Sequence, residues 1–113
     1  MNENTLFELA LFDPDHTLIA LLKRRDIEFR KIPVIHKFVV AMDETIEVVS
    51  NENNDVLIEN LTLIFVQWLN ENQYRKLQAL LVDGSTVYID EDDIKGVANI
   101  LKSSMKVAAF DPE

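Results

Sequence analysis

Hydrophobic and polar positions switch between a helical and a strand-like period along the chain. Residues 13–25 begin with Asp13-Pro14-Asp15, a typical helix start, and continue with leucines at helical spacing toward a basic end. From Ile27 to Ser50 the apolar positions alternate with a period of two, and Pro33 interrupts the run. We therefore expect one helix followed by two or three antiparallel strands, with a turn at Asp43-Glu44.

The first residues fit two structures. Thr5-Leu6-Phe7-Glu8 has the form of a capping box, and good helix formers follow it, which predicts a short helix. Phe7, Leu9 and Leu11 also alternate as in a strand, so a strand is the alternative.

The most apolar segment, residues 56–69, follows a polar cluster that is rich in helix N-cap residues. One face of the expected helix holds six large side chains at helical spacing: Leu57, Leu61, Ile64, Phe65, Trp68 and Leu69. Ile58, Leu63 and Val66 enlarge the apolar surface, so this helix must be covered on more than one side. The β-branched and aromatic residues at 62–66 leave a buried strand as the alternative.

The clearest local signal is Asp83-Gly84 between two alternating segments, 74–82 and 85–89. It predicts a hairpin, because Asp-Gly suits the positive φ angles of a tight turn. The acidic run at 90–93 then caps a final helix with Ile94, Val97, Ala98 and Leu101 at helical spacing. We expect residues 105–110 to pack back on the core and residues 111–113 to form a loose tail.

Together these elements predict an α+β fold, in which an antiparallel sheet built from two hairpin-like units has helices packed on one face. The chain has 113 residues, of which 48% are hydrophobic, and only two glycines. This size and composition fit a single domain over residues 1–113.

Motifs for catalysis, cofactors or metals are missing from the sequence. The chain has no cysteine, and its two glycines are isolated, so thiolate chemistry and a glycine-rich phosphate loop are excluded. His16 and His36 lie far apart, with no paired metal-ligand motif, and the acids at 90–93 lack the spacing of a calcium loop. We therefore predict no catalytic residue, no cofactor and no metal ligand.

Two stretches resemble parts of known modules. Residues 18–34 look like the first helix and second strand of glutaredoxin-like domains, but the cysteine pair that those domains use is missing. Residues 68–101, with Trp68-Leu69, two strands around Asp83-Gly84 and a terminal helix, are similar to the C-terminal half of small effector-associated modules of bacterial conflict systems. Neither stretch holds a diagnostic functional motif, so the sequence assigns the chain to no family.

Charge is unevenly distributed along the chain, which has 20 acidic and 11 basic residues and a net charge of −9. This charge disfavours nucleic acid as the partner. Six of the basic residues lie within residues 23–37, whereas residues 38–74 contain seven acids and no lysine or arginine. Solvated faces of ordinary elements would explain this pattern; the functional interpretation is an acidic surface that faces a basic protein.

Targeting and membrane signals are also missing. The N-terminus, Met1-Asn2-Glu3-Asn4, is acidic where a secretory signal would be basic. The longest apolar stretch is interrupted by Glu59 and Asn60 and falls short of the roughly 20 apolar residues of a membrane span. We expect a cytoplasmic protein with no membrane partner.

The leading functional hypothesis is a non-enzymatic, acidic protein-binding module: an inhibitor or immunity-type protein, or an accessory subunit of a larger bacterial assembly. Its candidate interface combines the surplus apolar surface of the central helix with the acidic stretch: Leu63, Val66, Asp43, Glu44 and Glu47. A homodimer through the same apolar surface is a further possibility. The alternatives are a small enzyme with an unrecognised carboxylate or histidine site and a structural, oligomer-forming subunit.

Overall fold

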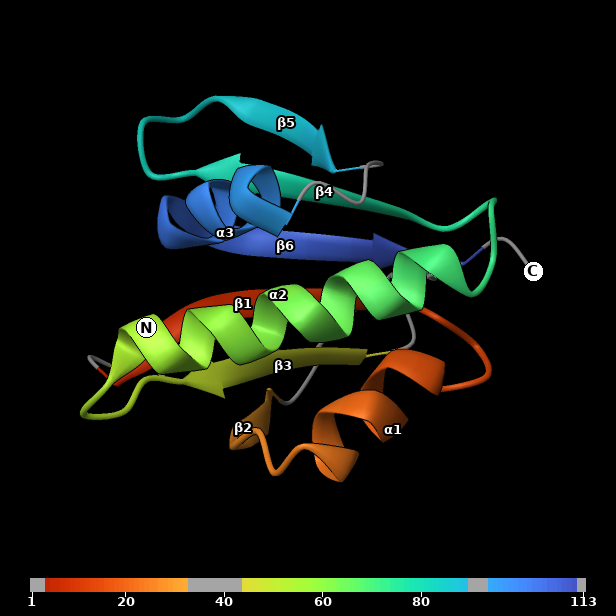
Figure 1. Ribbon diagram of the computed structural model, residues 1–113, viewed down its shortest axis with the longest axis horizontal. Helices are drawn as coiled ribbons and strands as arrows, with labels where there is room; N and C mark the ends of the chain where they lie inside the picture. The colour runs from red at the N-terminus through yellow and green to blue at the C-terminus, as the bar shows by residue number, and fades with distance from the viewer. Residues whose placement is uncertain (1–3, 33–43, 90–93, 112–113) are drawn as a thin grey trace, which may run out of the picture.

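A computed structural model of the chain describes residues 4–32, 44–89 and 94–111. These residues form three helices and six strands of one mixed sheet (Figure 1). In chain order the elements are β1 (Thr5–Phe12), α1 (Thr17–Arg24), β2 (Phe29–Ile32), β3 (Glu44–Val49), α2 (Asn54–Asn70), β4 (Lys76–Leu81), β5 (Thr86–Ile89), α3 (Ile94–Lys102) and β6 (Ser104–Phe110). The strand order across the sheet is β2-β3-β1-β6-β4-β5.

The fold is α+β, as expected, and most neighbouring strands are antiparallel. The expected antiparallel pairing does not extend to the centre of the sheet, where β1 and β6 run parallel from Glu8 opposite Lys106 to Phe12 opposite Phe110. Parallel neighbours cannot be joined by a tight turn. Almost the whole chain separates β1 from β6, so no local sequence pattern predicts their pairing.

The N-terminal segment is a central strand, so the prediction of a helix there is wrong. Phe7, Leu9 and Leu11 are buried on one face of β1. The Thr5 hydroxyl does not cap a helix; it donates a hydrogen bond to Glu47 Oε2 at 2.8 Å. The strand alternative is correct because the alternating apolar positions of β1 meet the core of a sheet. Residues 105–110 likewise belong to a central strand, β6.

Helix α1 begins at Thr17, later than the sequence predicts. Asp13 lies outside the helix, but its carboxylate accepts hydrogen bonds from the Leu18 amide at 2.8 Å and from the Thr17 hydroxyl. His16 occupies the N-cap position with a left-handed backbone, φ 56°. Asp13 therefore caps the helix from a preceding turn.

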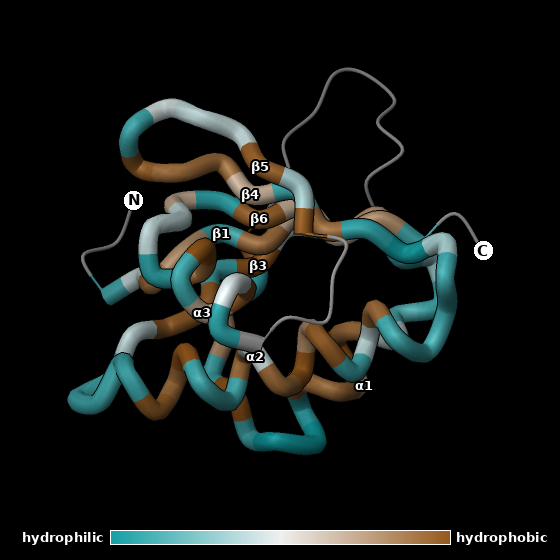
Figure 2. Tube along the Cα trace, turned by 45° about the horizontal axis from the view of Figure 1, so that its top comes forward, coloured by the Kyte–Doolittle hydropathy of each residue, from teal (hydrophilic) through white to brown (hydrophobic). Residues whose placement is uncertain are grey.

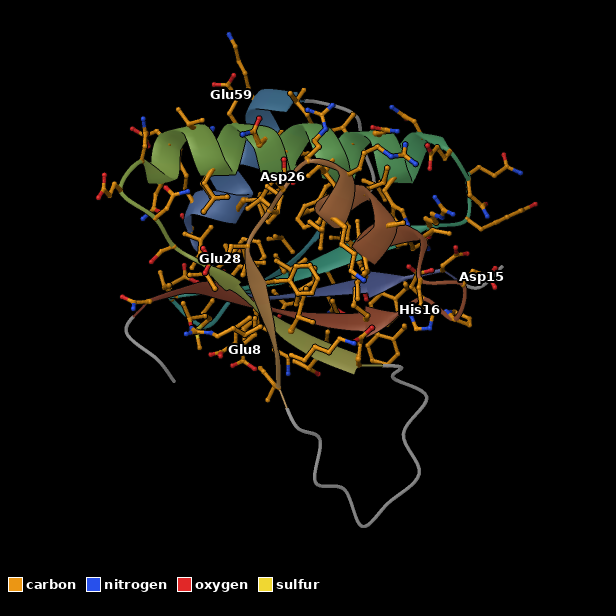
Figure 3. The ribbon with its side chains drawn as sticks, turned by 90° about the horizontal axis from the view of Figure 1, so that it is seen from below. Glu8, Asp15, His16, Asp26, Glu28 and Glu59 are labelled. Atoms are coloured by element: carbon orange, nitrogen blue, oxygen red, sulfur yellow. The ribbon has the colours of Figure 1, made fainter. Side chains whose placement is uncertain are left out.

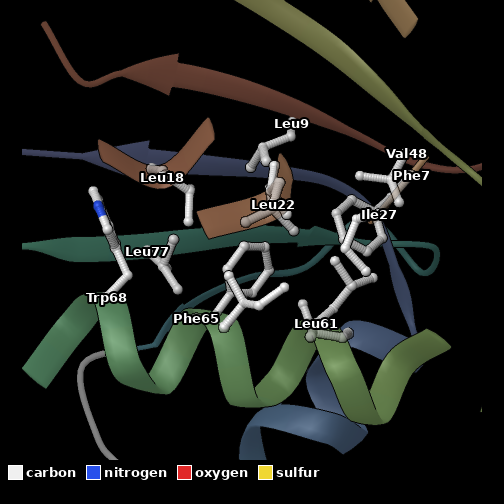
Figure 4. Close-up of a cluster of buried hydrophobic side chains, with 14 of the residues drawn as sticks. Phe7, Leu9, Leu18, Leu22, Ile27, Val48, Leu61, Phe65, Trp68 and Leu77 are labelled. Carbon is white, nitrogen blue, oxygen red and sulfur yellow. The ribbon is translucent and has the colours of Figure 1, made fainter. Parts of the chain in front are cut away.

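Helix α2 is the central element of the helical layer. The three helices cover the same face of the sheet (Figure 1), and α2 packs against both α1 and α3. Phe65 and Leu61 point from α2 toward the strands, beside Leu9 and Leu22 (Figure 4). The strand alternative for residues 62–66 is wrong. Hydrophobic positions run along the strands and recur at intervals along the helices (Figure 2), as one shared core requires.

Strands β4 and β5 form the predicted hairpin. Gly84 has the expected positive φ, 91°, whereas Asp83 does not. The Gly84 amide donates to Leu81 O, and the Leu81 amide donates to Ser85 O. This pattern is a three-residue loop closed by a glycine bulge, rather than a two-residue turn. Residues 90–93, which we expected to cap α3, lie outside the described residues.

Strands β2 and β3 confirm two of the antiparallel strands predicted between residues 27 and 50. Pro33, His36, the expected strand at 38–42 and the expected turn at Asp43 lie outside the described residues. The hairpin construction is therefore described only for β4 and β5. None of the described helices is long and apolar enough to cross a membrane.

Candidate functional site

The residues of the candidate interface do not form one surface. Leu63 lies on α2 with 36% of its surface exposed, and Val66 is partly buried against the core. Glu47 lies opposite Glu8 in the β1–β3 pairing. Glu8 projects from the side of the sheet that faces away from α2 (Figure 3), and paired strand residues share a face. Glu47 is therefore separated from Leu63 by the thickness of the sheet and the helical layer.

The acids of β3 are paired within the chain. Glu44 lies 3.6 Å from His16 Nδ1 and 3.9 Å from Lys31 Nζ. Glu47 lies 3.7 Å from Arg30 Nε. The cause is the antiparallel pairing of β2 with β3, which sets basic residues of one block opposite acidic residues of the next. The acidic and basic blocks that are separate in the sequence therefore partly neutralise each other in the fold. Asp43, the remaining acid of the candidate interface, lies outside the described residues.

No described helix lies over the second face of the sheet, which we call the uncovered face (Figure 3), although Ala10 and Thr45 on it are buried. Two short side chains, Ala10 of β1 and Ala108 of β6, lie side by side at its centre. Toward one end, Phe12 stacks on Phe110 with ring centroids 4.7 Å apart. This face therefore has small side chains at its centre and a pair of stacked aromatic rings toward one end.

A groove runs over β4 on this uncovered face. Its larger part has a volume of about 420 Å³ and is lined by Lys76, Gln78, Tyr88 and Phe110. An adjoining part of about 200 Å³ shares Gln78 and is lined by Leu80, Thr86, Lys106 and Ala108 as well. Tyr88 is 65% exposed, so a large aromatic side chain stands at the β5 wall of the groove.

The groove has the opposite charge to the chain as a whole. Its charged lining residues are Lys76 and Lys106, on a chain with a net charge of −9. Among the described residues neither lysine forms an ion pair, although Glu8 lies opposite Lys106 in the register. Two lysines beside aromatic rings favour a ligand that carries carboxylate groups.

A separate polar network lies at the carboxyl ends of β1 and β6. Arg75 Nε donates to Asp111 Oδ2 at 3.0 Å, and its guanidinium lies 4.8 Å from the Trp68 ring centroid. Trp68 Nε1 donates to Thr17 Oγ1 at 2.8 Å, and Thr17 Oγ1 donates to the carboxylate of Asp13. These contacts join β1, α1, α2 and β6, so the network has a structural role.

Sequence reasoning missed this network and the groove. One signal for the network is a repeated triplet, Phe12-Asp13-Pro14 and Phe110-Asp111-Pro112, which ends both central strands. The alternation within β4 and β5 could have placed Gln78 and Tyr88 on one face. It could not show that the helices leave that face uncovered.

Within the described residues, no group of three or more histidines, aspartates or glutamates is placed to hold a metal ion. His16 is exposed beside Glu44, and His36 lies outside the described residues.

Comparison with known proteins identifies no relative. No family model matches the chain, and no match was found among curated proteins or among solved structures.

Proposed function

We propose that the chain is a non-enzymatic module that binds another protein through the uncovered face of its sheet. The observation that carries the proposal is the groove over β4, in which Tyr88 and Phe110 stand beside Gln78 and two lysines. Exposed tyrosines supply much of the contact energy at protein interfaces, because the ring is large and its hydroxyl still forms hydrogen bonds. An inhibitor or an accessory subunit would use such a surface.

The groove suits a polypeptide better than a compact ligand. It is open along β4 from Phe110 to Lys106, so an elongated partner can lie in it. The Gln78 amide has both donors and acceptors, which match the N–H and C=O groups of a peptide backbone. Aromatic, amide and cationic groups in one shallow surface are typical of protein interfaces.

A basic partner would use a different part of the molecule. Glu52, Asp55 and Glu59 lie at or near the N-terminal half of α2, and no ion pair to them occurs among the described residues. Figure 3 shows Glu59 on the helical side of the molecule, away from Glu8. We assign the main contact to the groove because it combines shape, aromatic surface and charge.

Two exposed tyrosines allow a matched test. Tyr88 lies in the groove, whereas Tyr74 is exposed in the loop before β4. The tagged chain, Tyr88→Glu and Tyr74→Glu are used to capture proteins from a lysate of the organism that encodes the chain, and the captured proteins are identified by mass spectrometry. We expect a partner that the wild type and Tyr74→Glu retain and that Tyr88→Glu loses.

Equal thermal unfolding midpoints would show that both tyrosine variants are folded. The same captured proteins with all three baits, or none with any of them, would contradict binding through the groove.

A further inference from the structure

The two edges of the sheet differ in how they are protected. Edge strand β2 carries Arg30 and Lys31 and is followed in sequence by Pro33, and such residues discourage another strand from pairing. Edge strand β5 reads Thr-Val-Tyr-Ile, which contains no charge and no proline. All four residue types favour strands. The four residues of β5 therefore lack the protection that β2 has, and the acidic run that follows β5 in sequence begins only at Asp90.

The backbone of β5 has free pairing positions. The Leu81 amide donates to Ser85 O at 2.8 Å, which makes these two residues a hydrogen-bonded pair. Such pairs alternate along an antiparallel ladder, so Val87 and Ile89 direct their backbone groups to β4. Thr86 and Tyr88 therefore turn their N–H and C=O groups outward, where no described strand lies (Figure 1).

The outward-turned residues of β5 also border the groove. Tyr88 lines its larger part and Thr86 its smaller part. A strand added beside β5 would place every second side chain on the groove side, next to these two residues. Lys76 is on the neighbouring strand β4, and strands are about 4.8 Å apart, so a glutamate of the added strand and the lysine can meet above Tyr88.

Resting on the proposed function, we infer that β5 accepts an extended, acidic segment of a partner protein as a seventh strand. Backbone hydrogen bonds to Thr86 and Tyr88 hold the segment, and its carboxylate groups pair with Lys76. Apolar side chains at the other groove-facing positions cover the Tyr88 ring. Lys106 raises the positive potential at the far wall of the groove.

A library of random peptides of about ten residues, displayed on phage, provides the probe. Selection against the chain should enrich sequences in which aspartate or glutamate alternates with aliphatic or aromatic residues. One enriched peptide, synthesised with a fluorophore, is then titrated with each variant by fluorescence anisotropy. Absence of enrichment, or enrichment of basic sequences, would overturn the inference.

Position 86 separates strand addition from side-chain binding. Thr86→Pro removes an outward N–H group but no hydrogen bond to β4, and proline is tolerated where the N–H faces solvent. We expect it to weaken peptide binding by about tenfold or more, while Thr86→Val, which keeps the N–H, binds within about twofold of the wild type. Equal binding by Thr86→Pro and Thr86→Val would overturn strand addition.

The charge test uses matched lysines. Lys76→Glu should weaken binding by about tenfold, because a favourable pair becomes a repulsive one. Lys23→Glu, on the exposed end of α1, makes the same change in net charge and should bind as the wild type does. Equal affinities of the two variants would contradict an acidic partner in the groove.

Hydrogen exchange tests the wild-type chain directly. The amides of Thr86 and Tyr88 should exchange rapidly in the free protein and become protected in the peptide complex. Their failure to become protected would overturn strand addition even if Thr86→Pro did not fold.

The remaining outcomes identify other occupants. Binding that is lost in Tyr88→Glu but unchanged in Thr86→Pro would leave the proposed function standing and overturn this inference. Tighter binding of a labelled oligothymidylate than of the peptide would assign the groove to nucleic acid. Self-association that Thr86→Pro abolishes would assign the edge to a second copy of the chain.

Discussion

At the scale of single residues, the Arg75 side chain connects helix α2 with the residue that follows β6. Its guanidinium donates to Asp111, donates to the carbonyl of Trp68 at 2.8 Å and lies over the Trp68 ring. The Arg75 and Asp111 side chains are only 9% and 7% exposed. A buried ion pair of this kind adds little net stability when intact, but removing one of its two members is strongly destabilising.

Arg75→Met should therefore destabilise the fold strongly. We expect the free energy of unfolding to fall by roughly 3–5 kcal/mol, because the buried Asp111 carboxylate loses its ion pair and the Trp68 carbonyl loses a charged donor. Urea denaturation measures this change. Adding Asp111→Asn should recover part of the loss, since the buried charge is then removed; a double variant no more stable than Arg75→Met would show that the pair is not coupled.

The Asp83 carboxylate predicts a pH effect at the hairpin. The hydroxyl and the amide of Ser85 both donate to it, at 2.6 and 2.8 Å, and lower the pKa of Asp83 below its ordinary value. Because the folded pKa is depressed, the contribution of this carboxylate is present above the unfolded pKa and is lost as the pH falls through the folded pKa. NMR titration should show the Asp83 pKa rising in Ser85→Ala and unchanged in Ser103→Ala. An unchanged pKa in Ser85→Ala would exclude the Ser85 hydroxyl as its cause.

At the scale of elements, the β4–β5 hairpin depends on one backbone conformation. Gly84 has φ 91°, and a Cβ atom placed there would meet nothing within 4 Å. A side chain at this position is therefore opposed by backbone strain and not by a clash. The hairpin also forms the β5 wall of the groove, so its geometry and the site depend on each other.

Gly84→Val should lower the free energy of unfolding by roughly 1–3 kcal/mol, because a β-branched residue is strained in the left-handed region. Gly84→Asn should cost less, since asparagine tolerates this region. Urea denaturation of the two variants provides the comparison. Equal unfolding midpoints for the wild type and Gly84→Val would contradict the requirement for this conformation.

At the scale of the whole molecule, the surplus apolar surface of α2 is mostly covered within the chain. Ile58 is 3% exposed, and Val66 packs against the core. Leu63 and Val56, which lies seven residues before it on α2, remain at the surface with 36% and 50% of their surfaces exposed, but two exposed aliphatic side chains need no partner. The apolar surface of α2 therefore gives little reason to expect a homodimer through this helix.

Sedimentation equilibrium over a hundredfold concentration range tests this point. We expect the isolated chain to have the mass of a monomer throughout, and Leu63→Glu to have the same mass and nearly the same stability, because the substituted side chain reaches solvent. A wild-type dimer that dissociates in Leu63→Glu would instead place a homodimer interface on α2.

The sequence determined the elements whose signals are local. Helices α1, α2 and α3 could be predicted from apolar spacing and capping residues, and the β4–β5 hairpin from Asp83-Gly84. Each of these signals arises from interactions between residues that are close in sequence, so it does not depend on the tertiary contacts of the rest of the chain.

The tertiary structure alone decided the centre of the sheet and the site. Strand β1 resembled a helix, and residues 105–110 were expected to pack on the core without being predicted as a strand, because each strand is stabilised by a partner from the opposite end of the chain. The pairing of Arg30 with Glu47 cancelled charges that looked separated in the sequence. The groove depends on which face the helices cover, and that choice follows from long-range packing that no local pattern encodes.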